Sequence, residues 1–134
     1  MIDIENELYN TLATELRSKY SPIFISGDDT LSPSSFPCVY IVQRDNPVVM
    51  ENADSGSIER IVAPMFEVNV YSNLKTNRKQ QAKEIMATIC DKMAELDIER
   101  TYCQPTPNAD ASIYRIVGRF SCKTDGNKGK KKNI

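Results

Sequence analysis

The sequence predicts an α+β fold in which a mostly antiparallel or mixed sheet of about four to five strands has two helices packed on one face. Three patterns predict it. Residues 58–72 and 111–122 alternate apolar with polar side chains, as half-buried strands do, whereas residues 77–96 repeat apolar side chains at helical spacing. A chain of 134 residues can bury one core without disulfides or metal, so we expect a single domain over residues 1–122.

The N-terminal part predicts a helix, a short strand and a loop. Residues 3–20 form the predicted helix, with Asp3 as its N-cap and Pro22 preventing its continuation. Residues 23–26 are a short apolar strand candidate, and GDDTLSPSS at 27–35 has the turn-forming composition of an exposed loop. The apolar side of the helix consists of Ile4, Leu8, Leu12 and Leu16.

Residues 36–44, FPCVYIVQR, predict an inner strand that is covered on both faces and begins after Pro37. The next segment, 45–57, is too long for a tight hairpin turn and carries apolar residues without a local partner. Two interpretations stay open: an extension of the flanking hairpin strands, or an arm that packs on a neighbouring subunit. The candidate contact residues of this arm are Val48, Val49, Met50 and Glu51.

The strand at 58–72 carries two different faces. Glu67 and Tyr71 lie on the face turned away from the helices and are candidate partner contacts. Pro64 cannot donate a hydrogen bond to a neighbouring strand, so we expect the strand to bend near residues 63–65. The face that meets the helices consists of Phe66, Val68 and Val70.

The second helix is predicted over residues 77–96, where Asn77 and Gln80 have the spacing of a loose capping box. Strands are predicted at 98–103 and 111–122, on either side of a proline-containing turn. The helix-facing side of the last strand consists of Tyr114, Ile116, Gly118, Phe120 and Cys122.

Arg115 and Arg119 share the opposite, open face of the last strand and are candidate contact residues. Arg60 and Arg100, on neighbouring strands, would extend them into a basic patch. Nucleic-acid binding by a sheet uses interleaved aromatic rings for stacking, and Tyr71 is the aromatic residue we place on a compatible face. A solvated face or salt bridges between subunits is the favoured interpretation of these arginines.

The residue types do not predict an enzyme. The chain has no histidine, which excludes Ser-His-Asp and Cys-His nucleophilic sites, and its glycines form no phosphate-binding loop. Carboxylates such as Asp28 and Asp45 lack metal-ligand spacing, so we expect no catalytic residues, no metal and no cofactor. The cysteines are far apart and are expected to be small core residues: Cys38, Cys90, Cys103 and Cys122.

Charge separates the chain into an acidic body and a basic end. Residues 1–122 hold twelve basic and seventeen acidic residues, whereas residues 123–134 hold five lysines and one aspartate. The end has no apolar run to bury and is predicted to be a disordered tail. It either solubilises the protein or makes an electrostatic contact with DNA or an acidic ring surface through Lys128, Lys130, Lys131 and Lys132.

No apolar run approaches the roughly 20 residues that a membrane-spanning helix needs. The N-terminal residues MIDIENEL are acidic where a secretory signal peptide would be basic. We therefore expect a soluble protein, made in a cytoplasm and not bound to a membrane.

Three segments together resemble a known family. They are FPCVYIVQRDNPV, then FEVNVYSNLKTNRKQQAKEIMATICDKMAELDIERT, and finally DASIYRIVGRFSC. The order of these strand and helix patterns is similar to that of the small tail terminator, or tail completion, proteins of tailed bacteriophages and phage-tail-like particles. The resemblance covers residues 36–122, and its motifs are core patterns rather than catalytic ones.

The resemblance implies a structural virion protein located in the tail and assembled in the host cytoplasm. Such a protein forms a homohexameric ring that caps the tail tube and joins it to neck or head proteins, with the sheath as a further neighbour in contractile tails. A head-side connector, or head completion protein, is the alternative of the same class. A nucleic-acid-binding module that uses the basic tail, without sequence specificity, is the alternative of another class.

Overall fold

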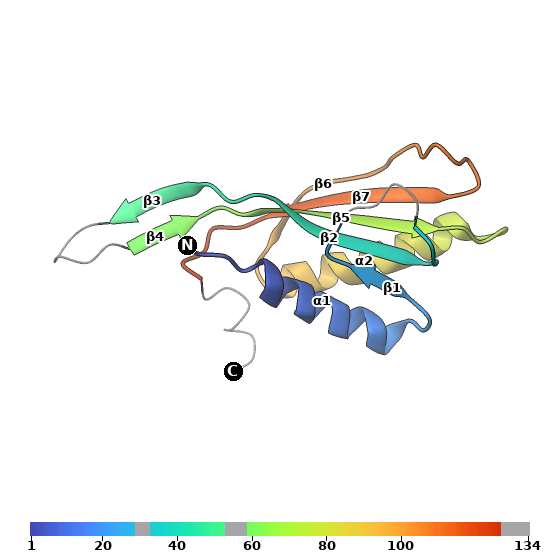
Figure 1. Cartoon of the computed structure of the whole chain (residues 1–134), viewed down its shortest axis with the longest axis horizontal. Helices are drawn as coiled ribbons and strands as arrows, with labels where there is room; N and C mark the ends of the chain where they lie inside the picture. The colour runs from blue at the N-terminus through green and yellow to red at the C-terminus, as the bar shows by residue number, and fades with distance from the viewer. Residues whose placement is uncertain (29–32, 53–58, 127–134) are drawn as a thin grey trace.

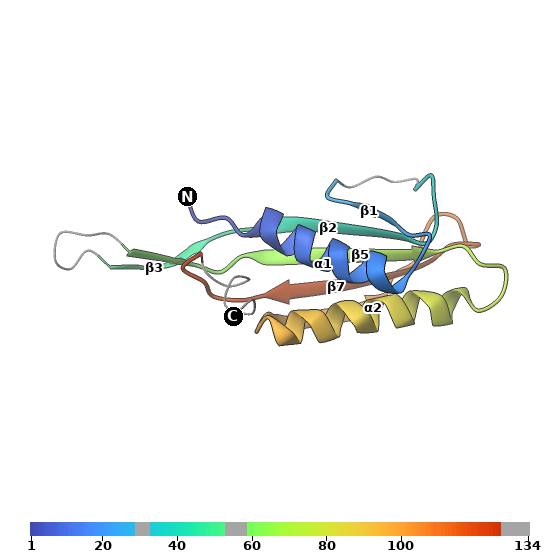
Figure 2. The same ribbon diagram turned by 90° about the horizontal axis from the view of Figure 1, so that it is seen from below.

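Two helices cover one face of a five-stranded sheet, and a separate two-stranded hairpin extends from one end of it (Figures 1 and 2). The coordinates are a computed structural model, and the structure describes residues 1–28, 33–52 and 59–126. In chain order the elements are α1 (Glu5–Lys19), β1 (Phe24–Ser26), β2 (Cys38–Asp45), β3 (Val48–Asn52), β4 (Glu59–Val62), β5 (Met65–Ser72), α2 (Arg78–Glu95), β6 (Glu99–Pro105) and β7 (Tyr114–Ser121).

The main sheet has the strand order β1-β2-β5-β7-β6, so β5 is its central strand. β1 runs parallel to β2, and the other neighbouring strands are antiparallel. The predicted α+β class, with its mixed sheet and two helices, is therefore confirmed. β3 and β4 form the second sheet, which projects beyond the end of the main sheet at the left of Figure 1.

The core lies between the helices and the alternating apolar face of the sheet. Phe66, Val68 and Val70 of β5 are fully buried there, as the period of two predicts. The stripe of α2 that covers them is also buried and consists of Ala82, Ile85, Met86, Ile89 and Met93. α1 completes the layer with Leu8, Leu12 and Leu16.

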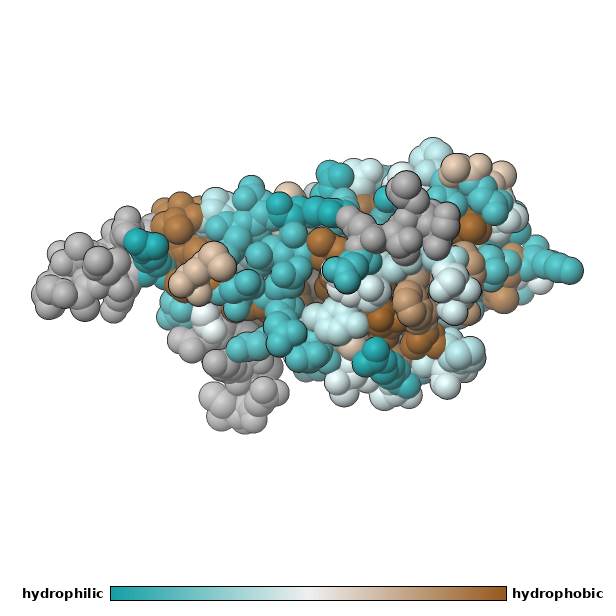
Figure 3. Space-filling view, in the orientation of Figure 1, coloured by the Kyte–Doolittle hydropathy of each residue, from teal (hydrophilic) through white to brown (hydrophobic). Residues whose placement is uncertain are grey.

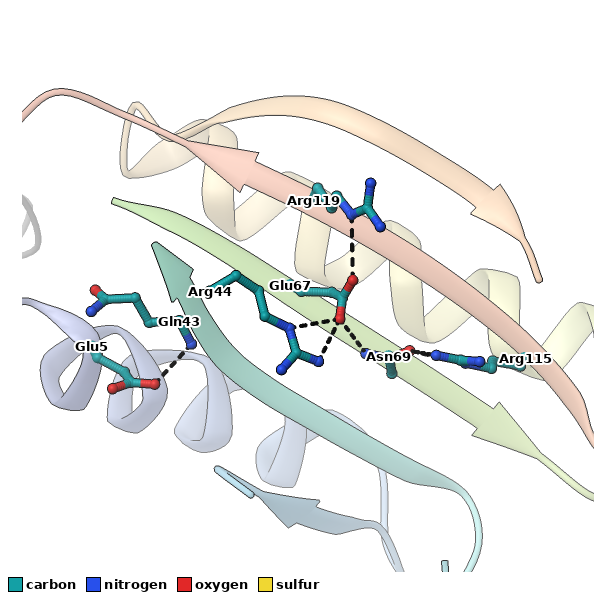
Figure 4. A network of polar contacts seen from close by, with 7 residues as sticks. All are labelled: Glu5, Gln43, Arg44, Glu67, Asn69, Arg115 and Arg119. Carbon is teal, nitrogen blue, oxygen red and sulfur yellow. Dashed lines mark hydrogen bonds and ion pairs between the residues drawn. The ribbon is translucent and has the colours of Figure 1, made fainter. Parts of the chain in front are cut away.

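β2 is an inner strand, but only its first half is covered on both faces. Residues Cys38 to Ile41 are buried, whereas Arg44 and Asp45 are exposed. β1 ends opposite Tyr40, so the later part of β2 lacks a strand on that side. There the Glu5 carboxylate of α1 accepts a hydrogen bond of 2.8 Å from the Gln43 backbone N–H (Figure 4), which satisfies a group that β1 leaves unpaired.

The predicted bend in residues 58–72 is confirmed as a break between β4 and β5 at Ala63 and Pro64. Beyond the break, residues 48–52 follow the hairpin-extension interpretation, because β3 pairs with β4 from Val48 to Asn52. The base of the hairpin is fastened by Thr124, which exchanges two backbone hydrogen bonds with Val62. Thr124 is buried, so the first residues of the predicted tail pack at the base of the hairpin.

The four candidate tail lysines, Lys128, Lys130, Lys131 and Lys132, lie outside the described residues. The same holds for residues 53–57 of the predicted arm. The side chains of Met50 and Glu51 are also outside the description, although their backbones pair with Ile61 and Arg60.

The helix starts differ from the predictions. α1 begins with Ile4 as its N-cap, and Asp3 instead accepts a hydrogen bond of 3.0 Å from the Glu5 backbone N–H. The capping box predicted for α2 is wrong, because Asn77 has a φ of 63° and makes no side-chain cap hydrogen bond. In this left-handed conformation Asn77 serves as the turn residue that leads into the helix, while Gln80 donates to Glu84 at 3.5 Å.

Gly118 gives a stability test of the contact between α2 and β7. A Cβ at this position would lie 2.9 Å from Phe120 Cε1 and 3.1 Å from Met86 Sδ, both in the buried core. We expect Gly118→Ala to lower the free energy of unfolding by about 1–3 kcal/mol through overpacking, measured by urea denaturation. Gly27→Ala is the matched control, since its Cβ would meet no atom closer than 3.8 Å, and equal losses in the two variants would contradict the explanation.

Candidate functional site

The face of the sheet that the helices leave open carries a connected group of charged and polar side chains, shown in Figure 4. The alternation of β5 places Glu67 and Asn69 on this face, and the register puts Glu67 opposite Arg119 of β7. Arg44 enters from β2 at a bulge, where the register shifts between Gln43 and Asp45. We call Arg44, Glu67, Asn69, Arg115 and Arg119 the arginine network.

Glu67 is the acceptor at the centre of the arginine network. Its Oε2 accepts hydrogen bonds from Arg44 Nε at 2.9 Å and Nη2 at 2.6 Å, and its Oε1 accepts one from Arg119 Nε at 3.3 Å. The Glu67 side chain is only 11% exposed, while both arginines reach solvent. A carboxylate in this position is stable because charged donors replace the water that burial removes.

Burial disfavours the charged form and would raise the pKa of Glu67. The hydrogen bonds from Arg44 and Arg119, with the positive charge of Arg44, outweigh burial and hold the pKa of Glu67 below its usual range. Glu67 is therefore ionised at neutral pH and fixes the guanidinium groups in place.

Asn69 connects Arg115 to the same centre. Its Oδ1 accepts hydrogen bonds from Arg115 Nε at 3.0 Å and Nη2 at 2.8 Å, and its Nδ2 donates to Glu67 Oε2 at 3.4 Å. Asn69 is buried, and both its amide oxygen and its amide nitrogen have hydrogen-bond partners inside the network. Three strands thus contribute to one polar cluster.

Aromatic rings flank the arginine network. The Arg115 guanidinium lies 5.7 Å from the ring centre of Tyr71, and that of Arg119 lies 4.9 Å from the ring centre of Tyr102. Tyr71 also packs edge-on against Tyr40, with ring centres 5.6 Å apart. The alternation of residues 58–72 predicts Tyr71 on this face, whereas Tyr40 and Tyr102 are placed there by the register of β2 and β6, which no local pattern predicts.

Within the arginine network, three guanidinium groups contact one carboxylate and one amide, so cationic groups outnumber anionic ones among these five residues. Guanidinium groups recognise carboxylates and phosphates by paired hydrogen bonds. The chemistry available on this face is therefore the recognition of anionic groups on a partner. Among residues 1–28, 33–52 and 59–126, no three histidine, cysteine or acidic side chains gather as metal ligands would.

Two arginines predicted for this patch lie elsewhere. Arg100 is on the helix side of the sheet, where its Nη1 donates to Cys90 Sγ of α2 at 3.7 Å. Arg60 belongs to β4, in the projecting hairpin and not in the main sheet. The predicted patch of four arginines is therefore wrong in these two members, whereas Arg115 and Arg119 are brought together as predicted.

The projecting hairpin forms a second candidate surface of different chemistry. Val48 and Val49 of β3 are 51% and 46% exposed, and Figure 3 shows apolar residues gathered over this hairpin. Apolar side chains exposed on a projecting element are typical of protein-protein contacts. The two surfaces lie on different sheets of the same subunit.

No protein-family model matches this sequence, and no curated protein matches it. None of the helices among the described residues is long and apolar enough to cross a membrane. Function is therefore inferred from the two surfaces themselves.

The central role of Glu67 can be tested by Glu67→Gln, which removes the negative charge and keeps the shape. We expect the free energy of unfolding to fall by about 1–3 kcal/mol near neutral pH, because hydrogen bonds to a charged group contribute about that much. Glu95→Gln is the matched control, since Glu95 is 59% exposed and contacts Lys92 at 3.4 Å. Its effect should stay within about 0.5 kcal/mol in chemical denaturation.

The stability difference between the wild type and Glu67→Gln should depend on pH in a defined direction. Because the pKa of Glu67 is lower in the folded state, its contribution is complete above the unfolded pKa of about 4.3 and is lost as the pH falls through the folded value. The stabilities of the wild type and Glu67→Gln should therefore converge in acid. A difference that stays constant from about pH 7 to about pH 3 would contradict the assignment.

Proposed function

We propose that this chain is a non-enzymatic structural subunit that assembles with copies of itself into a ring, and that the ring is a tail terminator. The observation that carries the proposal is the hairpin β3–β4, which extends beyond the main sheet and exposes Val48 and Val49. An apolar projection of this kind gains stability when a second surface covers it.

The position of the hairpin favours a head-to-tail contact. An isolated two-stranded hairpin is marginally stable in water, and this one is held at its base by Thr124 and by the hydrogen bond from Ala63 N–H to the Pro47 carbonyl. The exposed side chains of Val48 and Val49 are available to a neighbour. A contact between a hairpin and a different patch of the next copy is heterologous, and such contacts close into rings when the rotation allows it.

The arginine network supports a second contact. A body with more acidic than basic residues offers carboxylates to a positive surface, so copies of this chain or other acidic partners fit the open face. In the proposed assembly the hairpin joins neighbouring subunits, while the sheet face is available to tube, neck or sheath proteins. The resemblance of residues 36–122 to tail terminators supports the specific role, with a homohexamer in the virion tail as its implied form.

The assembly can be tested with the purified chain and a tail tube protein. We expect rings of one defined mass that bind the end of tubes and stop their growth, observed by sedimentation and electron microscopy. Binding to the head vertex rather than to tubes would instead identify a head-side connector. A chain that stays monomeric alone and in the presence of tubes would overturn the proposal.

The hairpin contact is tested by the double variant Val48→Ser and Val49→Ser. We expect self-association to weaken by at least tenfold, because burying one valine side chain contributes about 1.5–3 kcal/mol. The melting temperature of the monomer should change little, since both side chains are exposed in it. Leu74→Ser is the matched control, as Leu74 is 41% exposed in the β5–α2 connection, and an equal effect there would contradict a specific role of the hairpin.

A second candidate function, nucleic-acid binding, is favoured by the excess of guanidinium groups beside Tyr71 and Tyr102. On this alternative, deleting residues 127–134 should strongly reduce retention on DNA at low salt, because the deletion removes four lysines and leaves Thr124 in place. Replacing Arg119 by Gln should reduce the remaining retention. Retention that is unchanged in both variants would contradict DNA binding by either surface.

A further inference from the structure

Cys90 and Cys103 come together on the helix side of the sheet, although one lies on α2 and the other on the edge strand β6. Gly118 of β7 explains the approach. It pairs with Cys103, and its missing side chain lets Met86 of α2 pack closely against β7. Cys90 follows Met86 by one helical turn, so it faces the neighbouring strand β6 at the level of Cys103.

The two thiols are neighbours and accessible. Neither is part of a disulfide. Both are half-buried and line the same open hollow of about 420 Å³ on the surface between α2 and β6. A small reagent can therefore reach them, which distinguishes the pair from the buried Cys38.

The charges around the pair are mainly positive. Arg100 donates a hydrogen bond of 3.7 Å to Cys90 Sγ, and Lys83 lines the same hollow, where Asp91 is the acidic residue. The Arg100 guanidinium is placed to donate to negative charge on Cys90 Sγ during a reaction in which the thiolate is the attacking form. Burial raises the pKa of Cys103, and the neighbouring Cys90 raises it further.

We propose that Cys90 and Cys103 form a redox-active dithiol site whose substrate is a low-molecular-weight disulfide, with Cys90 as the attacking and Cys103 as the resolving thiol. This chemistry does not depend on the proposed function. The order of the two steps follows from geometry, because the Arg100 guanidinium donates its hydrogen bond to Cys90 Sγ.

The reaction is a two-step thiol-disulfide exchange. The Cys90 thiolate attacks one sulfur of the small disulfide, forms a mixed disulfide and releases one small thiolate, which takes up a proton. Cys103 then loses its proton and attacks Cys90 Sγ, so that the Cys90–Cys103 bond forms and the second small thiol leaves. The protein loses two electrons and two protons, and the small disulfide gains them.

The product would join α2 to β6. Because β6 is paired on one side only, by β7, the new bond would fasten an edge strand to the helix layer. The closed loop contains the end of α2 and the start of β6, and restricting it reduces the freedom of the unfolded chain. The oxidised protein should therefore melt at a higher temperature than the reduced one.

The site is tested by incubating the full-length chain with oxidised glutathione and measuring intact mass, peptide mass and free thiols. We expect the mass to fall by two hydrogen atoms, the four free thiols to fall to two, and one cross-linked peptide to contain Cys90 and Cys103. The double variant Cys38→Ser and Cys122→Ser should react in the same way. A bridge that involves Cys38 or Cys122, or one that links two chains, overturns the proposal.

The roles of the two thiols and of Arg100 are tested separately. Cys103→Ser, or Cys103→Ala where the serine variant does not fold, should accumulate glutathione on Cys90. Arg100→Gln should slow the first step by roughly threefold or more, while Arg100→Lys should keep most of the rate. Glutathione on Cys103 in the wild type before any appears on Cys90, or an Arg100→Gln rate equal to the wild-type rate, overturns the assigned order.

Discussion

The central strand β5 must satisfy two environments at once, and the rest of the structure depends on how it does so. Its residues alternate between an apolar face under the helices and a polar face that is almost as deeply buried. Phe66 and Val68 need only apolar neighbours. Glu67 and Asn69 need donors and acceptors in fixed places, because a buried polar group without partners is costly.

The need of Glu67 and Asn69 for hydrogen-bond partners determines how side chains are arranged on the open face. Arg44, Arg115 and Arg119 come from the strands on both sides of β5 and converge on Glu67 and Asn69. Their long side chains cover the polar centre while their charged ends still reach solvent. The polar cluster that stabilises the monomer is also the surface proposed above to contact a partner, so on this proposal folding and recognition would use the same residues on this face.

The amphipathic patterns were sufficient to predict the elements and the two faces of the sheet. Period-two alternation placed Phe66 inward and Arg115 and Arg119 outward, and Pro64 marked the break that separates β4 from β5. Alternation fails where a strand contains a bulge. Between Arg100 and Tyr102 the register shifts by one residue, so Arg100 faces the helix instead of sharing the open face with Tyr102.

Other parts of the site depend on long-range packing that no local pattern contains. Arg44 reaches Glu67 through the bulge in β2, and Cys90 meets Cys103 because Gly118 lets α2 approach the sheet. Neither contact has a sequence spacing that would predict it. The left-handed conformation of Asn77 likewise follows from the path of the chain between β5 and α2. In this conformation Asn77 does not make the side-chain cap that an asparagine favours.

The break at Ala63 and Pro64 also separates the hairpin β3–β4 from the main sheet, and the two parts are stabilised by different contacts. Among the described residues, the hairpin β3–β4 shares no strand pairing with the main sheet, and its base is held by contacts of Pro47, Val62 and Thr124. Exposed residues of the hairpin can therefore change without loss of the core that lies below β5. A chain built in this way can keep its fold under one set of constraints while the exposed hairpin changes under another, which would suit the assembly proposed above.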